Sequence, residues 1–216
     1  MPLDRYPIKG VIWYQGESNA HNYEAHEKLF RLLVGSWREN WNDPDLPFYY
    51  VQLSSIDRPS WPWFRDSQRR LMDAIPHTGM AVSSDYGDSL DVHPKNKRPI
   101  GERLAHWALN RTYDKKQVVP SGPLFRSVDF REDAAYVGFD YADGLHTADG
   151  RPIREFEIAE TEGLYYPAKA EVVGNQVRVY SDRVKHPCYV RYAWRPFTRA
   201  NLVNSQSLPA STFRSR

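Results

Sequence analysis

The stretch Ile8-Lys-Gly-Val-Ile-Trp-Tyr-Gln-Gly-Glu-Ser-Asn19 joins a short apolar run to a polar loop. The run has the length and composition of a buried strand, and the Gly and Asn residues after it are turn formers. Apolar residues then recur at helical spacing between a potential N-cap, Asn22, and the helix-ending Pro44. These residues are Tyr23, Phe30, Leu33, Val34, Trp37 and Trp41. The stretch therefore predicts a strand, a polar loop and an amphipathic helix in succession.

The same unit occurs twice more along the chain. Residues 48–53 and 79–83 read as buried strands, and a loop and a helical pattern follow each of them. The apolar faces of these helices contain Phe64, Leu71, Met72 and Ile75 in one, and Ile100, Leu104, Trp107 and Ala108 in the other. Alternating strands and helices predict a parallel sheet that binds ligands at the carboxyl ends of its strands. Functional residues are therefore expected in loops 15–22, 54–63 and 84–99.

The pattern changes after Pro120-Ser-Gly-Pro123. Residues 135–139, 171–173, 176–180 and 189–194 read as strands separated by Gly and Asn turns. We therefore expect a partial α/β domain over residues 1–119 and an all-β, sandwich-like region over residues 120–216.

The composition limits the classes of partner. Lys and Arg total 29 and Asp and Glu total 27, so a net charge of +2 gives no electrostatic basis for binding nucleic acid or an anionic membrane. Aromatic residues make up 14% of the chain, which weakly favours a carbohydrate ligand because exposed rings stack against sugars. The single cysteine, Cys188, excludes an intrachain disulfide and is expected to be a buried small hydrophobe. Met1-Pro-Leu-Asp-Arg5 does not have the apolar stretch of a signal peptide, and localisation is left open.

The loop after the first strand carries candidate oxyanion donors. Gln15 supplies an amide, and Gly16 supplies a backbone N–H with no side chain over it. An oxyanion site needs such fixed donors aimed at the developing negative charge. The alternative is a polar strand-to-helix turn in which Asn19 or Asn22 caps the helix. The two interpretations are evenly matched on this loop alone.

Asp91 and His93 form a candidate acid–base pair in the third carboxyl-end loop. A carboxylate beside an imidazole fixes its tautomer and stabilises the imidazolium, which is a general-base arrangement. The alternative is a loop carboxylate with a structural histidine. A metal site is weaker still, because no second His or Cys lies at ligand spacing. Gly87-Asp-Ser-Leu90 spells a lipase tetrapeptide but follows the third strand, so we interpret Ser89 as a coincidence.

Three long motifs resemble the sialate O-acetylesterases, a branch of the SGNH hydrolases. They are Gly10-Val-Ile-Trp-Tyr-Gln-Gly-Glu-Ser-Asn-Ala20, then Asp91-Val-His-Pro-Lys-Asn-Lys97 with Gly101-Glu-Arg-Leu-Ala105, and a tail with Val190-Arg-Tyr-Ala-Trp194, Asn201-Leu202 and Leu208-Pro-Ala-Ser-Thr-Phe-Arg214. Arg65 and Gln68 also match the family pattern. The resemblance covers essentially the whole chain. It implies a three-layer, flavodoxin-like parallel sheet.

The resemblance also implies hydrolysis of O-acetyl groups on sialic acid or other sugars by a serine mechanism that uses no metal or cofactor. His93 would be the general base, and Gln15 and Gly16 would belong to the oxyanion site. Glu17 and Asn19 would shape the loop or touch the substrate. Many relatives place the acid three residues before the histidine, where this chain has Leu90, so either Asp91 or a backbone carbonyl would orient His93.

Relatives carry the nucleophile in a Gly-Gln-Ser-Asn segment upstream of the Trp-Tyr-Gln-Gly-Glu motif, and this chain begins too late to contain it. Ser18 is the best internal substitute, because Gly16-Glu-Ser-Asn19 imitates that segment on a strand-to-helix turn. Weaker candidates, which cap or form turns more often, are Ser54, Ser55, Ser83 and Ser84. An N-terminally truncated sheet would expose an edge that invites a homo-oligomer or a partner chain.

The main prediction is therefore a carbohydrate O-acetylesterase with His93, Asp91 and Ser18 as catalytic residues. One alternative is a non-catalytic carbohydrate-binding protein that uses the aromatic loop Trp61-Pro-Trp-Phe64. The other is a half-enzyme that works only with a separate serine-bearing chain, or an inactive truncation.

Overall fold

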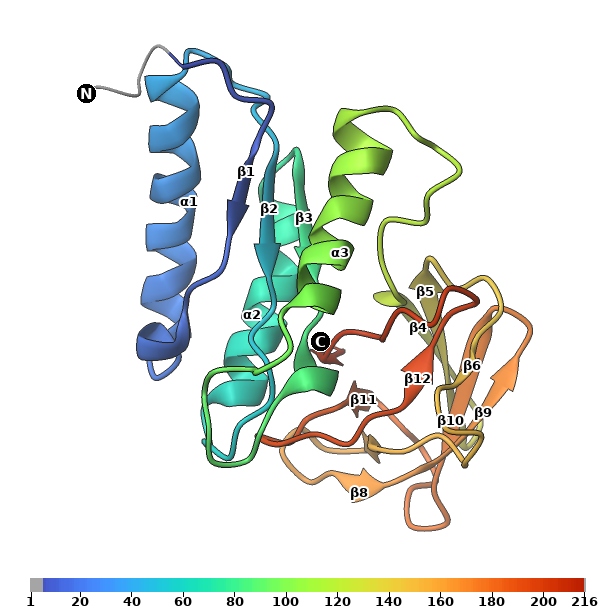
Figure 1. Ribbon diagram of the computed structural model, residues 1–216. Helices are drawn as coiled ribbons and strands as arrows, with labels where there is room; N and C mark the ends of the chain where they lie inside the picture. The colour runs from blue at the N-terminus through green and yellow to red at the C-terminus, as the bar shows by residue number, and fades with distance from the viewer. Residues whose placement is uncertain (1–5, 216) are drawn as a thin grey trace.

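A computed structural model describes residues 6–215. Its first half is built on a parallel sheet of three strands in the order β1-β2-β3, with bounds β1 (Val11–Trp13), β2 (Phe48–Val51) and β3 (Thr78–Ala81) (Figure 1). Val11 lies opposite Phe48 and Phe48 lies opposite Thr78, so the carboxyl ends of the strands meet at one edge of the sheet. Among the described residues, β1 is paired on one side only.

Helices cover both faces of this sheet. The crossovers run through α1 (Tyr23–Asn40) and α2 (Trp61–Ala74), and α3 (Arg98–Trp107) follows β3 and leads into a π-helical turn, Ala108–Thr112. α1 and α2 contact each other, because successive right-handed crossovers in one direction place both helices on one face. α3 packs on β2 and β3 from the other face, in front of the strands in Figure 1. The predicted three-layer α/β fold is confirmed.

The first helix begins and packs as the sequence predicts. Asn22 is its N-cap, and the side-chain Oδ1 accepts the N–H of Ala25 at 3.0 Å. The buried side chains of α1 are His26, Phe30 and Val34. The Phe30 ring meets the sheet edge-on, with its centroid 5.7 Å from Phe48 and 4.9 Å from Tyr50. The apolar face of α1 thus packs against the parallel sheet and forms part of its hydrophobic core.

The rest of the chain is antiparallel β-structure. Its strands are β4 (Leu124–Arg131), β5 (Ala134–Asp140), β6 (His146–Thr147), β7 (Phe156–Ala159), β8 (Tyr166–Pro167), β9 (Lys169–Val173), β10 (Gln176–Tyr180), β11 (Tyr189–Tyr192), β12 (Leu202–Val203) and β13 (Phe213–Arg214). They form four-stranded sheets in the orders β4-β5-β10-β9 and β13-β11-β7-β8, and a small pair, β12-β6. Side chains of both larger sheets share one hydrophobic core, separate from that of the parallel sheet. The all-β, sandwich-like character of this region is confirmed, and the boundary between residues 119 and 120 stays a prediction.

The expectation that Cys188 is buried is wrong, because its side chain is exposed. Cys188 lies just before β11, where its N–H bonds to the Ala159 carbonyl at 2.8 Å. The strand alternation that buries Val190 and Tyr192 begins only with the next residue, Tyr189. Within residues 6–215, no helix is both long and apolar enough to span a membrane. The expectation about a signal peptide concerns residues 1–5, which lie outside the described residues.

Candidate active site

The loops after the parallel strands meet at the carboxyl edge of the sheet. β1 is followed by a 3₁₀ turn at Glu17–Asn19, and β3 is followed by another at Ser84–Tyr86. β2 continues into a buried segment, residues 52–56, before α2 begins. In Figure 1 these loops lie at the lower end of the sheet, beside the first turn of α2. The fold therefore gathers the loops in which functional residues were expected.

Gly16 fixes the position of the first loop. It is buried with a φ of 149°, and a Cβ built on it would lie 2.8 Å from two ring carbons of Phe64. This φ favours glycine, and the Phe64 ring leaves no room for a side chain. The Gly16 carbonyl accepts the Asn19 N–H at 2.9 Å, which closes the turn that contains Glu17 and Ser18. The close contact with the Phe64 ring of α2 thus explains why residue 16 is glycine. The same contact holds the Gly16 backbone in place.

A buried histidine supports the ring that contacts Gly16. The His26 ring centroid lies 4.5 Å from that of Phe64 and 5.7 Å from that of Phe30. Burial lowers the pKa of His26 to about 4, and the negative charge of Glu27 opposes this shift. A neutral imidazole therefore packs against Phe64 at neutral pH.

Acidification is expected to destabilise the protein through His26. Its pKa is 6.5 in an unfolded chain and about 4 in the fold, so between these values the unfolded chain binds the proton more strongly. The free energy of unfolding should fall as the pH drops from 6.5 and level off below 4, by about 3 kcal/mol in total. Urea unfolding at pH 7 and pH 4.5, followed by tryptophan fluorescence, measures this loss.

The variant His26→Leu should lose this part of the pH dependence. His21→Leu is the matched control, because His21 is exposed and lies just before the N-cap of α1. An equal acid sensitivity in wild type and His26→Leu would show that other groups cause it.

Gln68 of α2 completes the carboxyl end of β2. Its side-chain amide donates to the Val51 carbonyl at 3.0 Å and accepts the Leu53 N–H at 2.9 Å. The Tyr50 hydroxyl donates to the Gln68 carbonyl at 2.7 Å. Gln68 thus gives β2 the pairing that a neighbouring strand would give. The Gln68 side chain therefore satisfies backbone groups on both sides of the point where β2 ends.

Arg65 connects this segment with the β-rich region. Its guanidinium is fully buried and donates to Ser55 Oγ at 3.1 Å, to the Ala193 carbonyl at 3.1 Å and to the Pro196 carbonyl at 3.3 Å. It also donates to the Arg195 carbonyl. Burial lowers the pKa of Arg65 to about 9, which leaves it charged at neutral pH. Arg65 is therefore a buried clamp between the loop after β2 and residues 193–196.

Two residues without a predicted role fix the third loop. Arg103 of α3 donates to both carboxylate oxygens of Asp85, at 2.7 and 2.6 Å, and to the Val82 carbonyl at 2.6 Å. Gly87 lies so close to Ser55 that a Cβ on it would be 2.2 Å from the Ser55 carbonyl oxygen. The contact joins the loops after β2 and β3. Gly87 thus has a role in packing, while Ser89 of the same tetrapeptide lies exposed.

The segment with His93 is built from two side-chain turns. Asp88 Oδ1 accepts the N–H groups of Leu90 at 2.8 Å and Asp91 at 3.2 Å, and these bonds lower the pKa of Asp88. Asp91 Oδ1 accepts the His93 N–H at 2.9 Å and lies 3.5 Å from His93 Nδ1. The contact of Asp91 with the backbone of His93 is thus closer than its contact with the His93 ring. The imidazole is 76% exposed, which leaves its other nitrogen free for a substrate.

Tyr14 brings the His93 loop to the Gln15 loop. Val92 and Tyr14 pack against the same buried cluster, which includes Leu53 and Phe64, and Lys97 Nζ lies 5.2 Å from the centroid of the Tyr14 ring. Tyr14 directly precedes Gln15 and Gly16, so the loop that contains His93 borders the candidate oxyanion loop. Tyr14 was not predicted as a site residue. In the sequence, Tyr14 is the last residue of the apolar run and looks like a core residue of the strand. Its contacts with the His93 loop come from residues far along the chain, which a local pattern does not reveal.

The Tyr14 hydroxyl is buried and makes no hydrogen bond of ordinary geometry with the described residues. Burial raises the pKa of Tyr14, while the hydroxyls of Ser54 and Ser83 lie close enough to lower it and Glu17 adds to the rise. Glu17 therefore lies near this hydroxyl. Tyr14 is therefore a neutral phenol whose hydroxyl lies near Ser54 and Ser83.

The candidate serines fall into two groups. Ser18 is exposed in the turn after Gly16, and its side chain forms no hydrogen bond with His93 among residues 6–215. The others, Ser54, Ser55, Ser83 and Ser84, are buried. Ser55 Oγ donates to the Ser84 carbonyl at 2.9 Å, and Ser83 Oγ donates to the Gln52 carbonyl at 2.6 Å. These two hydroxyls are committed to the framework, whereas the Ser18 hydroxyl is accessible. Within the described part of the chain, no three His, Cys, Asp or Glu residues gather as a metal site.

Comparison with known proteins identifies the family. Residues 3–110, half of the chain, match the model of the family described as carbohydrate esterase, sialic acid-specific acetylesterase. The chain is 25% identical to rat (Rattus norvegicus) sialate O-acetylesterase, covering 100% of this chain and 45% of the rat protein. It is 27% identical to the human (Homo sapiens) sialate O-acetylesterase, covering 98% of this chain and 46% of that protein.

A solved structure shares the whole fold. A carbohydrate acetylesterase from Xanthomonas citri superposes with a TM-score of 0.93 at 38% sequence identity, covering 100% of this chain and 52% of that chain. The chain thus spans about half the length of the relatives that it matches. The family match covers the parallel sheet and all three predicted site loops. By fold and by sequence, the chain belongs to the sialic acid-specific acetylesterase family of carbohydrate esterases.

Proposed function

We propose that this chain hydrolyses O-acetyl esters of sugars, on sialic acid or on another acetylated carbohydrate. The observation that supports this most directly is the contact of the His93 loop with Tyr14, beside Gln15 and Gly16, in a member of this esterase family. A general base and fixed hydrogen-bond donors at one edge of a parallel sheet are the parts that acyl transfer needs.

The proposed reaction uses side chains of this chain only. A serine hydroxyl attacks the acetyl carbonyl carbon, and His93 accepts the serine proton. The negative charge forms on the former carbonyl oxygen, where the Gln15 amide and the Gly16 N–H donate to it. The bond to the sugar oxygen then breaks, and that oxygen takes the proton from His93. Water, activated by His93, releases acetate and restores the serine.

Ser18 is the proposed nucleophile, because it is the exposed serine of the Gly16 turn. Wild type is expected to release acetate from 4-nitrophenyl acetate and from an O-acetylated sugar, and Ser18→Ala should lose this activity by about 10²-fold or more. Ser89→Ala is the matched control, an exposed serine in a neighbouring loop. Full activity of Ser18→Ala would leave the esterase function standing and reject Ser18. An inactive wild type would contradict the proposal for the isolated chain.

A partner chain at β1 is a second proposal, for which the free edge gives the reason. Ile12 of β1 is 69% exposed, and α1 exposes Leu29 and Leu32. A further strand beside β1, from a second copy or from another chain, would pair this edge and cover Ile12. Light scattering together with specific activity at increasing protein concentration tests it. A monomer whose specific activity is constant would contradict self-association.

The carbohydrate-binding alternative is not favoured by the aromatic loop. Trp61 and Phe64 are buried. The Trp63 ring stacks on that of Tyr23 with their centroids 6.2 Å apart, and the guanidinium carbon of Arg214 lies 4.4 Å from the centroid of the Trp63 ring. Two of the three rings of this loop are therefore used in the core, and the third, Trp63, is 38% exposed with Tyr23 and Arg214 against it.

A further inference from the structure

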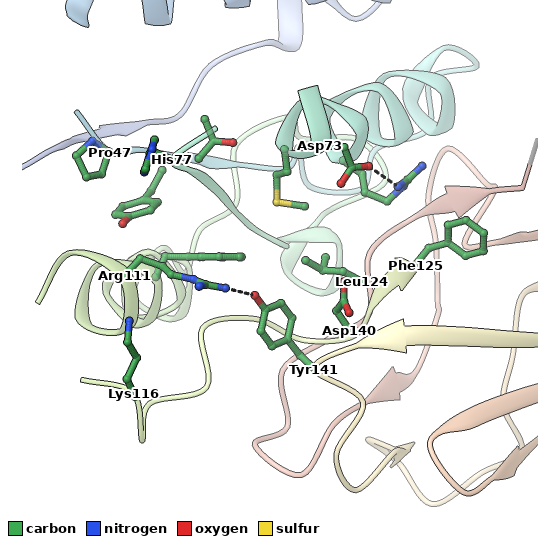
Figure 2. Close-up of a pocket in the computed structure, with 14 residues that line it drawn as sticks. Pro47, Asp73, His77, Arg111, Lys116, Leu124, Phe125, Asp140 and Tyr141 are labelled. Carbon is green, nitrogen blue, oxygen red and sulfur yellow. Dashed lines mark hydrogen bonds and ion pairs between the residues drawn. The ribbon is translucent and has the colours of Figure 1, made fainter. Parts of the chain in front are cut away.

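A cavity of about 470 Å³ lies away from the candidate active site. Its lining includes Pro47, His77 and Thr78, which stand at the amino ends of β2 and β3, whereas the candidate active site is at the carboxyl ends. α2, the π-helical turn and strands β4 and β5 supply the other walls (Figure 2). The volume is that of a small-molecule site. Both the α/β part and the β-rich part of the chain therefore contribute to it.

One side of this cavity is cationic. Arg111 stands in the π-helical turn, a form of helix found frequently at functional sites. Its Nη2 donates to the Tyr141 hydroxyl at 2.9 Å, and Figure 2 shows these two side chains pointing toward one another. No carboxylate among residues 6–215 pairs with Arg111. Lys116 lies on the same side, 2.9 Å from Asp114.

The field of these two cations reaches into the cavity. Burial raises the pKa of Tyr49, while its hydrogen bond with Thr112 and the charges of Arg111 and Lys116 lower it. Tyr49 lines the cavity, so the positive potential is felt at its wall. An anionic group at this position would meet a guanidinium with free N–H donors, which is suited to a carboxylate.

Another side of the cavity carries two carboxylates beside the guanidinium of Arg69. Asp73 of α2 is 79% exposed and lies 3.7 Å from Arg69. Asp140, at the end of β5, lies 3.6 Å from Arg126 and is about half exposed. Their remaining carboxylate oxygens can accept hydrogen bonds from hydroxyl groups. The lining therefore offers a cation for an acid group and carboxylates for hydroxyls.

We propose that this cavity binds a sugar acid, with its carboxylate on Arg111 and its hydroxyls toward Asp73 and Asp140. The choice of a carbohydrate rests on the proposed function, and the site is separate from the loops that carry catalysis. The esterase would thus hold an acidic sugar, or an acidic residue of a longer glycan, at the far end of the sheet.

The test is calorimetric titration of the full chain with glucuronate and N-acetylneuraminate, neither of which contains an O-acetyl ester. Glucose and acetate serve as the neutral sugar and the simple anion. We expect the sugar acids to bind and both comparison compounds to bind much more weakly. If acetate bound as tightly as the sugar acids, the site would recognise only an anion. If glucose bound as tightly, the carboxylate and therefore Arg111 would not contribute to recognition. Either result, or no binding at all, would overturn the proposal.

Variants of the lining residues test whether the ligand binds in this cavity. Arg111→Gln should weaken binding of the sugar acids by about tenfold or more. Tyr141→Phe, which keeps the ring and removes the hydroxyl that orients Arg111, should weaken it less. Lys115→Gln removes a neighbouring charge that does not line the cavity and is the matched control. Thermal melts verify that each variant is folded, and unchanged binding by folded Arg111→Gln would overturn the proposal.

The same titration with His93→Ala separates this proposal from the proposed esterase activity. Binding should persist in this variant, and it should persist even if the wild-type chain shows no hydrolysis. Loss of binding in folded His93→Ala would place the sugar acid at the catalytic loops and overturn the second site.

Discussion

Replacing His93 with alanine is expected to lower kcat/KM for acetyl hydrolysis by about 10²- to 10⁴-fold, the usual contribution of a general base. The side chain is 76% exposed and forms its polar contact with Asp91, so its removal should change the free energy of unfolding by less than about 0.5 kcal/mol. A loss of activity without a loss of stability distinguishes a catalytic role from a structural one. The measurement is a kinetic assay with 4-nitrophenyl acetate and an O-acetylated sugar, beside urea unfolding of the same samples.

Two variants of Asp91 refine this prediction. Asp91→Asn keeps an oxygen that can accept the His93 N–H and removes the charge, whereas Asp91→Ala removes both. If the charge stabilises the imidazolium, both variants should be impaired; if Asp91 only shapes the turn, Asp91→Asn should be close to wild type. His186→Ala is the control, an exposed histidine far along the chain. Wild-type rates in His93→Ala would contradict the assignment of the base.

Replacing Arg65 with methionine is expected to lower the free energy of unfolding by about 3 to 5 kcal/mol. Methionine fills much of the space but leaves the carbonyls of Arg195 and Pro196 without their side-chain donor, and leaves Ala193 with only the longer bond from Thr212. Each buried group left unpaired costs about 1 to 3 kcal/mol. Arg98→Met is the matched control, because the Arg98 side chain is 87% exposed. Urea unfolding monitored by tryptophan fluorescence gives both values, and a loss below about 1 kcal/mol for Arg65→Met would contradict the clamp.

The sequence predicts the parallel sheet well because its signals are local. The apolar run before Gln15, the cap at Asn22 and the helical spacing after it each act within a few residues. β4 was not predicted, although its side chains are partly apolar. A register shift between Phe125 and Ser127 breaks the period of two on which strand prediction depends. Sequence patterns therefore fail where a bulge interrupts the alternation.

The loops of the candidate site were predicted from the sequence, whereas the contacts that hold these loops in place were not. The motifs pointed to Gln15, Gly16 and His93, and the fold brings their loops together. Nothing near Gly87 in the sequence indicates that it must lie against Ser55, because the contact joins loops separated by α2 and β3. The error about Cys188 has a similar origin, since Cys188 lies one residue before the strand and its exposure depends on tertiary packing. The packing of Gly87 and the exposure of Cys188 are determined by tertiary contacts, which local sequence patterns do not contain.

The buried guanidinium of Arg65 also bears on whether the two halves of this chain are interchangeable modules. Its acceptors lie about 130 residues later in the sequence, at Ala193, Arg195 and Pro196. A fragment that ends before the β-rich region would retain the charge and lose these acceptors, and a grafted replacement would need carbonyls in the same places. Recombination between relatives is therefore expected to succeed when the crossover keeps Arg65 together with its own residues 193–196, and to yield poorly folded protein when it separates them.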